Sequence, residues 1–171
     1  MQTRQVLFLW HMHQPYYGLP NRDTSFLPWV RLHSVKSYYD VARTLEAHPD
    51  IHSTVNFSGS LLKQLHEYVS LGRRDTWWDL TLKPAASLSD AEKRHLVKHF
   101  FSVDWDHCVR RYPRYAELLE ARERGTALEQ FTDRDWTDLQ VYFNLAWVGF
   151  SVRAESEIVQ GLIAKGHDCG V

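Results

Sequence analysis

The chain has 171 residues, of which 44% are hydrophobic and 24% are charged, a composition typical of one globular domain rather than of a disordered segment. The 20 Lys and Arg residues almost balance the 21 Asp and Glu residues, and the formal charge of −1 gives no basic surface for nucleic acid or anionic membranes. No apolar stretch approaches the ~20 residues that span a bilayer, so we expect neither a nucleic-acid partner nor a membrane partner.

The cysteines and the start of the chain indicate a reducing compartment. Cys108 and Cys169 form no CxxC or metal-binding spacing, which favours free thiols. The apolar run Val6–Trp10 is too short for the core of a signal peptide, and no small-residue cleavage site follows it. We therefore expect a cytoplasmic protein. The sequence also lacks Gly-rich phosphate-binding and dinucleotide-binding motifs, and we expect no cofactor.

The first half of the sequence alternates between strand and helix patterns. The run Val6–Trp10 is typical of a buried strand of a parallel sheet. A polar loop leads to Pro28, where apolar residues at helical spacing begin, and Pro49 ends that helix. His52–Phe57 predicts a second strand, and the helix after it stops at Gly72. This pattern therefore predicts that residues 1–75 form a βαβα unit with parallel strands.

The second half, residues 76–171, is mostly helical. Ser89 with Glu92 predicts a capping box, Pro113 can open a helix, and Thr132 can cap another. The expected helices are residues 90–101, 113–124, 135–148 and 155–165. We find no strand after Phe57. Because parallel strands need neighbours on both sides, this α/β pattern predicts an incomplete fold whose remaining strands come from outside the chain.

The sharpest local feature is the segment His11-Met12-His13-Gln14-Pro15, which directly follows the first expected strand. Ligands of parallel α/β proteins bind at the carboxyl ends of strands. Residues i and i+2 of an extended segment point the same way, so His11 and His13 are expected to face one volume. Imidazole and amide groups donate and accept hydrogen bonds on short arms, which suits a hydroxyl-rich ligand.

Two other interpretations of this segment stay open. A His-x-His pair at a strand end is also a common metal site, completed by a third His or a carboxylate, and would then serve a metal-dependent hydrolase. The two imidazoles can equally be hydrogen-bonded loop residues. Asn56 ends the second expected strand on the same rim, where it either binds the ligand or caps the next helix, a role that Ser58 can also take.

Aromatic residues give weaker candidates. Trp29, Arg31 and His33 flank the start of the first helix, where a Trp on a loop could stack on a sugar. Trp77 and Trp147 fit better as packing residues than as ligand contacts.

Four segments in order resemble glycoside hydrolase family 57. LFLWHMHQPYY is similar to the first signature of that family, a His-x-His-Gln-Pro core after strand one. PWVRLHSVKSYYDV, VNFSGSLLKQLHEY and DLQVYFNLAWVG are similar to amylase-like members of the family. The resemblance extends roughly from Val6 to Lys165, and it covers only the amino-terminal portion of such proteins.

The resemblance implies a partial (β/α)7-type barrel, made of the first βα units and followed by the helical region. It also implies a retaining mechanism and α-glucan substrates, with α-amylase, 4-α-glucanotransferase and branching activities in the family. It implies no metal and no cofactor. By this resemblance His11, His13 and Gln14 bind sugar hydroxyls around the scissile bond, and we expect Asn56 to join them as a substrate-binding residue.

The catalytic residues of the family have no match in this chain. A glycosidase needs two carboxyl groups flanking the scissile bond, and the acidic residues here fall mostly on expected helix surfaces. The resemblance places the nucleophile Glu and the acid/base Asp beyond Val171. We therefore expect a truncated amino-terminal part of a catalytic domain that is inactive alone, with a companion chain as a conceivable source of the rest of the barrel. The alternative is a noncatalytic domain that binds an oligosaccharide or a partner protein.

Overall fold

A computed structural model describes residues 6–20 and 22–164, which form a mixed α/β protein with two small parallel sheets. The strands are β1 (Leu9–Met12), β2 (Thr24–Ser25), β3 (Thr54–Phe57) and β4 (Arg74–Asp75). The helices of the first half are α1 (Trp29–His33), the π-helical turn η1 (Ser34–Tyr38), α2 (Tyr39–Ala47), α3 (Gly59–Ser70), α4 (Thr76–Leu82) and the 3₁₀ turn η2 (Ala85–Ser87). Those of the second half are α5 (Asp90–His99), the π-helical turn η3 (Trp105–Val109), α6 (Pro113–Glu123), α7 (Ala127–Gln130), α8 (Asp133–Trp147), α9 (Phe150–Glu155) and α10 (Glu157–Leu162).

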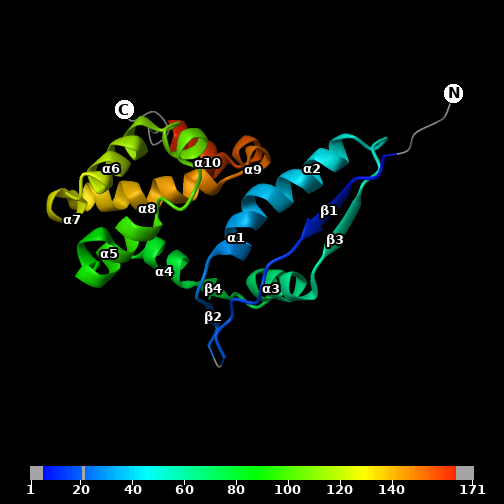
Figure 1. Ribbon diagram of the computed structural model, residues 1–171, viewed down its shortest axis with the longest axis horizontal. Coiled ribbons are helices and arrows are strands. Elements are labelled where there is room, and N and C mark those ends of the chain that lie inside the picture. The colour runs from blue at the N-terminus through cyan, green and yellow to red at the C-terminus, as the bar shows by residue number, and fades with distance from the viewer. Residues whose placement is uncertain (1–5, 21, 165–171) are drawn as a thin grey trace.

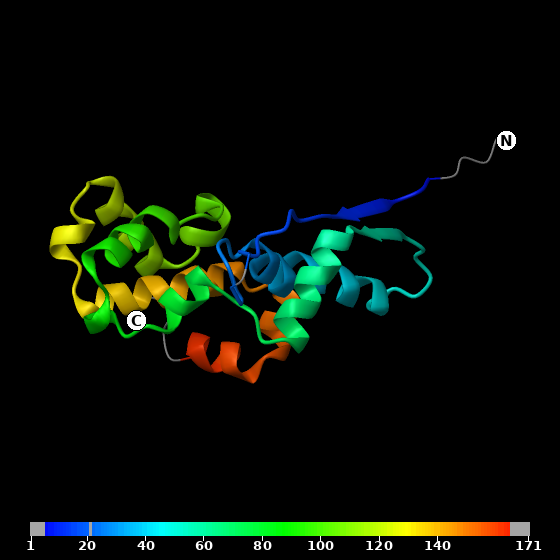
Figure 2. The ribbon, with the colours of Figure 1, turned by 90° about the horizontal axis from the view of Figure 1, so that it is seen from below.

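The molecule is elongated. Helices α5 to α8 gather at one end, and the β1–β3 sheet lies at the other end beside α2 and α3 (Figures 1 and 2). Helix α9 packs against α2 and so connects the two ends. Within the described residues, none of these helices has the length and apolar character needed to cross a membrane.

The predicted parallel pairing of the first two strands is confirmed, but the first strand begins later than predicted. β1 runs from Leu9 to Met12, so His11 lies inside the strand rather than after it. The shift has a simple cause, because β3 begins only at Thr54, whose N–H donates to the carbonyl of Phe8. Residues before Phe8 therefore have no strand opposite them, and a strand requires a hydrogen-bonded neighbour.

The helices that precede β4 follow the predicted pattern. Helical structure continues from α1 through η1 to α2, beginning directly after Pro28. The Ser58 hydroxyl accepts a hydrogen bond from the N–H of Leu61 and caps α3, so capping falls to Ser58 and not to Asn56. Gly72 follows the end of α3 with φ of +67°, a conformation that glycine adopts without strain.

The expectation that no strand follows Phe57 is wrong. β4 pairs in parallel with β2, and together they make the second sheet. A strand of two residues cannot show an alternating pattern, and Asp is disfavoured in strands, so the sequence carries no signal for it. Asp75 occupies this position because its carboxylate accepts the N–H of Trp78 at 2.8 Å and caps α4.

Both capping predictions in the second half are confirmed. Ser89 and Thr132 form capping boxes with the acidic residues three positions later. α8 begins at Asp133, two residues earlier than predicted, because a helix starts directly after its N-cap residue. The last predicted helix, residues 155–165, corresponds to α10, which begins after Ser156, and its predicted end at Lys165 lies outside the described residues. The short helix α9 directly before Ser156 was not predicted.

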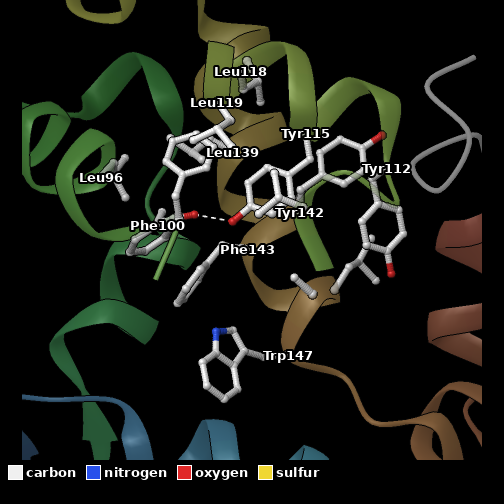
Figure 3. Packing of buried hydrophobic residues seen from close by; sticks show 14 of the residues in the cluster. Leu96, Phe100, Tyr112, Tyr115, Leu118, Leu119, Leu139, Tyr142, Phe143 and Trp147 are labelled. Carbon is white, nitrogen blue, oxygen red and sulfur yellow. Dashed lines mark hydrogen bonds between the residues drawn. The ribbon is translucent and has the colours of Figure 1, made fainter. Parts of the chain in front are cut away.

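The main core belongs to the helical half. Aromatic side chains from α6, from α8 and from the residues directly after α5 pack together in it (Figure 3), and the Tyr115 hydroxyl donates a hydrogen bond to the carbonyl of Phe100. Trp77 and Trp147 are buried in this cluster, which confirms their assignment as packing residues. A smaller cluster joins β1 to α1 and α3, and its buried members are Met12, Tyr17, Val30 and Leu61.

Candidate functional site

Alternate residues of the β1–β3 sheet face opposite ways. Met12 is buried and packs with Leu61, so its face of the sheet lies against the helices. Trp10, two residues before Met12, points to the same side and lines a cavity with residues of α2. His11 and its partner across the sheet, Asn56, point to the opposite side and are exposed. The sheet therefore presents one face to the helices and one face that no described residue covers.

The uncovered face carries the polar groups that the sequence singles out. The rings of His11 and His13 are stacked, with centroids 5.8 Å apart and an angle of 9° between their planes. Nδ1 of His11 lies 2.7 Å from Oδ1 of Asn56. The structure therefore brings His11, His13 and Asn56 together, with His11 between the other two.

The contact with Asn56 fixes the protonation pattern of the neutral His11 ring. An amide oxygen only accepts, so Nδ1 of His11 carries the proton and donates it. Nε2 is then an acceptor, and the amide nitrogen of Asn56 keeps two donors. The pair offers both a donor and an acceptor, which is the combination that a sugar hydroxyl uses.

Gln14 has a different position. Its Oε1 accepts a hydrogen bond from the Tyr17 hydroxyl at 2.8 Å, and its Nε2 donates to the Tyr38 hydroxyl at 3.4 Å. Its side chain is half-buried, unlike the exposed rings of His11 and His13. Gln14 therefore fixes the loop after β1, and the structure does not bring its amide into the His11–Asn56 pair.

Gln64 also holds this loop, and the sequence analysis did not identify it. Gln64 of α3 is fully buried, its Oε1 accepts the N–H of Tyr17 at 2.8 Å, and its Nε2 donates to the carbonyl of Pro15 at 2.9 Å. A signal for it exists in the sequence, because Gln64 interrupts the apolar stripe that Leu61 and Tyr68 share on that helix. A polar residue in such a stripe is expected to have a buried hydrogen-bond partner.

Arg31 belongs to a buried network that the sequence does not show. Its Nε and Nη2 donate to the two oxygens of Asp75 at 2.7 and 3.2 Å, and the Tyr68 hydroxyl donates to the same carboxylate at 3.2 Å. Burial, followed by the charge of Asp75, raises the pKa of Tyr68. Arg31 therefore anchors α1 to β4. This two-point ion pair explains the presence of an arginine here, and no role in ligand binding is needed to explain it.

Trp29 and His33 also serve packing. Trp29 lies in α1 rather than on a loop, and its ring centroid is 5.5 Å from that of Trp77 and 5.9 Å from that of Trp147. His33 contacts Trp147 edge to face at 5.2 Å. Burial, with a smaller effect of Lys36, lowers the pKa of His33. These side chains fill the junction between α1 and the main core.

His11 and His13 gain no further metal ligand in the described part of the chain. Across residues 6–20 and 22–164, no three His, Cys, Asp or Glu side chains are grouped so that they could hold a metal ion. The donor set of a metal-dependent hydrolase, which needs a third protein ligand, is thus incomplete in that range.

Comparison with known proteins identifies the family. The model of glycosyl hydrolase family 57 matches residues 7–167. The chain belongs to this family. The match includes the whole β1–β3 sheet as well as the helical region, so the uncovered face and the helices are both parts of the family 57 sequence. Membership indicates a glycoside hydrolase type of function and a carbohydrate substrate. No curated protein and no solved structure matches the chain.

Proposed function

We propose that the chain is the amino-terminal part of a retaining family 57 enzyme that acts on α-glucans as an α-amylase or a 4-α-glucanotransferase. The observation that carries this proposal is the uncovered face of β1–β3, where His11, His13 and Asn56 lie together in a chain of a glycosidase family. Nε2 of His11 accepts one glucose hydroxyl, and the amide of Asn56 donates to a neighbouring one. Gln14 supports this face by holding the loop that carries His13.

The catalytic carboxylates are proposed to lie outside this chain. A retaining glycosidase needs two carboxyl groups ~5–5.5 Å apart, and neither β1 nor β3 contains Asp or Glu. Lys83 and hydrogen bonds from Ser89 lower the pKa of Glu92 to about 2, whereas an acid catalyst needs a raised pKa. We accordingly assign binding, and no catalytic step, to the residues of this chain.

The exposed apolar residues of β1 and of the segment directly before it support a partial barrel. Val6, Leu7 and the following residues to Trp10 are 48–79% exposed, although strands of parallel sheets are normally covered on both faces. We propose that further parallel strands pair with the outer edges of β1 and β3 and complete a (β/α)7-type barrel. Residues 1–75 are then its first βαβα unit, residues 76–171 are a helical insertion, and a companion polypeptide is the proposed source of the remaining strands.

Binding of maltoheptaose, measured by isothermal titration calorimetry, tests the proposed site. His11→Ala removes the acceptor and the stacking partner of His13, and a net hydrogen bond of about 1 kcal/mol corresponds to roughly fivefold weaker binding. His66→Ala, an exposed position on α3, is the matched control and is expected to change nothing. Equal affinities of the two variants would refute the assignment of the site.

A second assay tests the position of the catalytic pair. The purified chain, shown to be folded by circular dichroism, is incubated with an α-glucan, and both hydrolysis and transfer products are measured. We expect no turnover by the chain alone. Activity that persists through repeated purification would show that the carboxylates lie within these 171 residues, and it would leave the binding result intact.

A further inference from the structure

One face of α3 forms hydrogen bonds with successive residues of the loop that follows β1. Ser60, Gln64 and Glu67 lie four and three residues apart on that helix, a spacing that places them on one side of it. The Ser60 hydroxyl donates to the carbonyl of Gln14 at 2.6 Å, and a carboxylate oxygen of Glu67 accepts the Tyr16 hydroxyl at 3.0 Å. Polar side chains of α3 therefore hold this loop at several points.

Gln64 lies in the middle of this face and is fully buried. Its amide makes two contacts with the backbone of the loop: Oε1 accepts the N–H of Tyr17 at 2.8 Å, and Nε2 donates to the carbonyl of Pro15 at 2.9 Å. Nε2 also donates to the carbonyl of Ser60 within α3 at 3.0 Å. Both N–H groups and the oxygen of the amide are thus engaged, so the side chain is fixed in one orientation.

The backbone itself gives this loop little support. Among the described residues, no backbone group of residues 14–16 is hydrogen-bonded to another backbone group. Pro15 has no N–H to contribute. Gln64 therefore does for this segment what a neighbouring strand does for β1. His13, whose ring stacks on that of His11, directly precedes the segment, so the position of His13 depends on how the loop is held.

We propose that Gln64, assisted by Ser60, is a positioning residue of the glucan site, an inference that rests on the function proposed above. Because the Gln64 side chain is fully buried, it does not contact the ligand itself. It holds the loop in the conformation that keeps His13 beside His11 before the ligand arrives. Without these hydrogen bonds, binding must also order the loop, and the conformational entropy lost in that step weakens the affinity.

Gln64→Met tests this role, because it keeps the length of the side chain and removes its three hydrogen bonds. Gln140→Met is the matched control: Gln140 of α8 is also buried and donates to two backbone carbonyls, those of Leu80 and Lys83, but it lies in the helical half, away from the β1–β3 sheet (Figure 1). Isothermal titration calorimetry with maltoheptaose at pH 6 gives the dissociation constant and, through the stoichiometry, the fraction of protein able to bind. We expect Gln64→Met to raise the dissociation constant at least fivefold at unchanged stoichiometry, and Gln140→Met to change it less than twofold.

Two further variants separate positioning from stability. A buried carboxyl group favours its neutral form, which accepts and donates as an amide does, so Gln64→Glu is expected to bind within twofold of wild type at pH 6. Ser60→Ala removes only the contact of a half-buried hydroxyl with the Gln14 carbonyl, and it is expected to raise the dissociation constant at least twofold even if Gln64→Met does not fold.

The outcomes distinguish this role from the glucan site itself. If wild type binds maltoheptaose and Gln64→Met or Ser60→Ala binds it equally well, the positioning role is overturned and the glucan site stands. The same holds if Gln64→Met lowers only the stoichiometry, since that result shows a loss of folded protein, or if Gln64→Glu binds as weakly as Gln64→Met. If wild type binds no maltoheptaose, the glucan site fails, and the positioning role fails with it.

Discussion

Replacing Asp75 by Ala removes several contacts from a carboxylate that is completely buried. Its oxygens accept two hydrogen bonds from Arg31, at 2.7 and 3.2 Å, and one from the Tyr68 hydroxyl at 3.2 Å. Oδ1 also accepts the N–H of Trp78 at 2.8 Å and caps α4. The substitution therefore leaves a largely buried guanidinium without its counter-charge and a helix without its cap.

The expected loss is about 3–5 kcal/mol in the free energy of unfolding. Removal of one partner from a buried ion pair costs about that much, and loss of an N-cap, about 1 kcal/mol, overlaps with it because one carboxylate has both roles. The free energy of unfolding of a natural domain is about 5–15 kcal/mol in total. Asp75→Ala is therefore expected to be clearly destabilised, and to unfold if the wild-type value lies at the lower end of that range.

Urea unfolding followed by circular dichroism measures the effect. The matched control is Asp106→Ala, whose exposed pair with Arg110 is expected to contribute less than about 1 kcal/mol. A second comparison adds Arg31→Met to Asp75→Ala, and the double variant should be less destabilised than the sum of the single ones, because the uncompensated charge is gone. A loss below about 1 kcal/mol for Asp75→Ala would refute the reasoning, as would strict additivity.

Two further predictions concern a titrating group and a close backbone contact. Burial, with smaller effects of His99 and Lys98, lowers the pKa of His95, so the unfolded chain binds protons at a higher pH than the folded chain does. The free energy of unfolding should therefore decrease as the pH falls below about 6.5. In urea titrations His95→Gln should reduce that decrease, whereas His66→Gln, at an exposed position, should not. Gly149→Ala would place its Cβ 2.4 Å from Oδ2 of Asp40 and should cost about 1–3 kcal/mol in thermal or urea unfolding, whereas Gly161→Ala, whose added Cβ meets nothing within 4 Å, should be neutral or slightly stabilising; equal midpoints for the two alanine variants would contradict the close contact.

Local features of the fold were predictable because their causes lie within a few residues. Ser89 and Thr132 begin helices through hydrogen bonds that reach three positions along the chain. The parallel pairing of β1 and β3 follows from their hydrophobic runs and the helix between them. The stacking of His11 on His13 follows from the two-residue period of a strand.

Long-range contacts had no such signal. β4 is too short to show a pattern, and nothing near Asp75 in the sequence indicates that its carboxylate is buried and pairs with Arg31, 44 positions earlier. Gln14 belongs to the signature segment, but its amide forms hydrogen bonds with Tyr17 and Tyr38 and does not join the side chains on the uncovered face. These outcomes depend on which side chains the packing of α1, α3 and α8 brings together.

The sequence by itself determined the family-like signature, the alternation of the first strands and helices, and the ends of most helices, because each rests on short-range periodicity and capping. Only the tertiary structure decided that His11 pairs with Asn56 across β1 and β3, that Asp40 is held by the start of α9, and that Gln64 holds the loop after β1. These contacts join residues far apart in the chain, and their energies depend on burial and on mutual distance, which no local pattern of residues specifies.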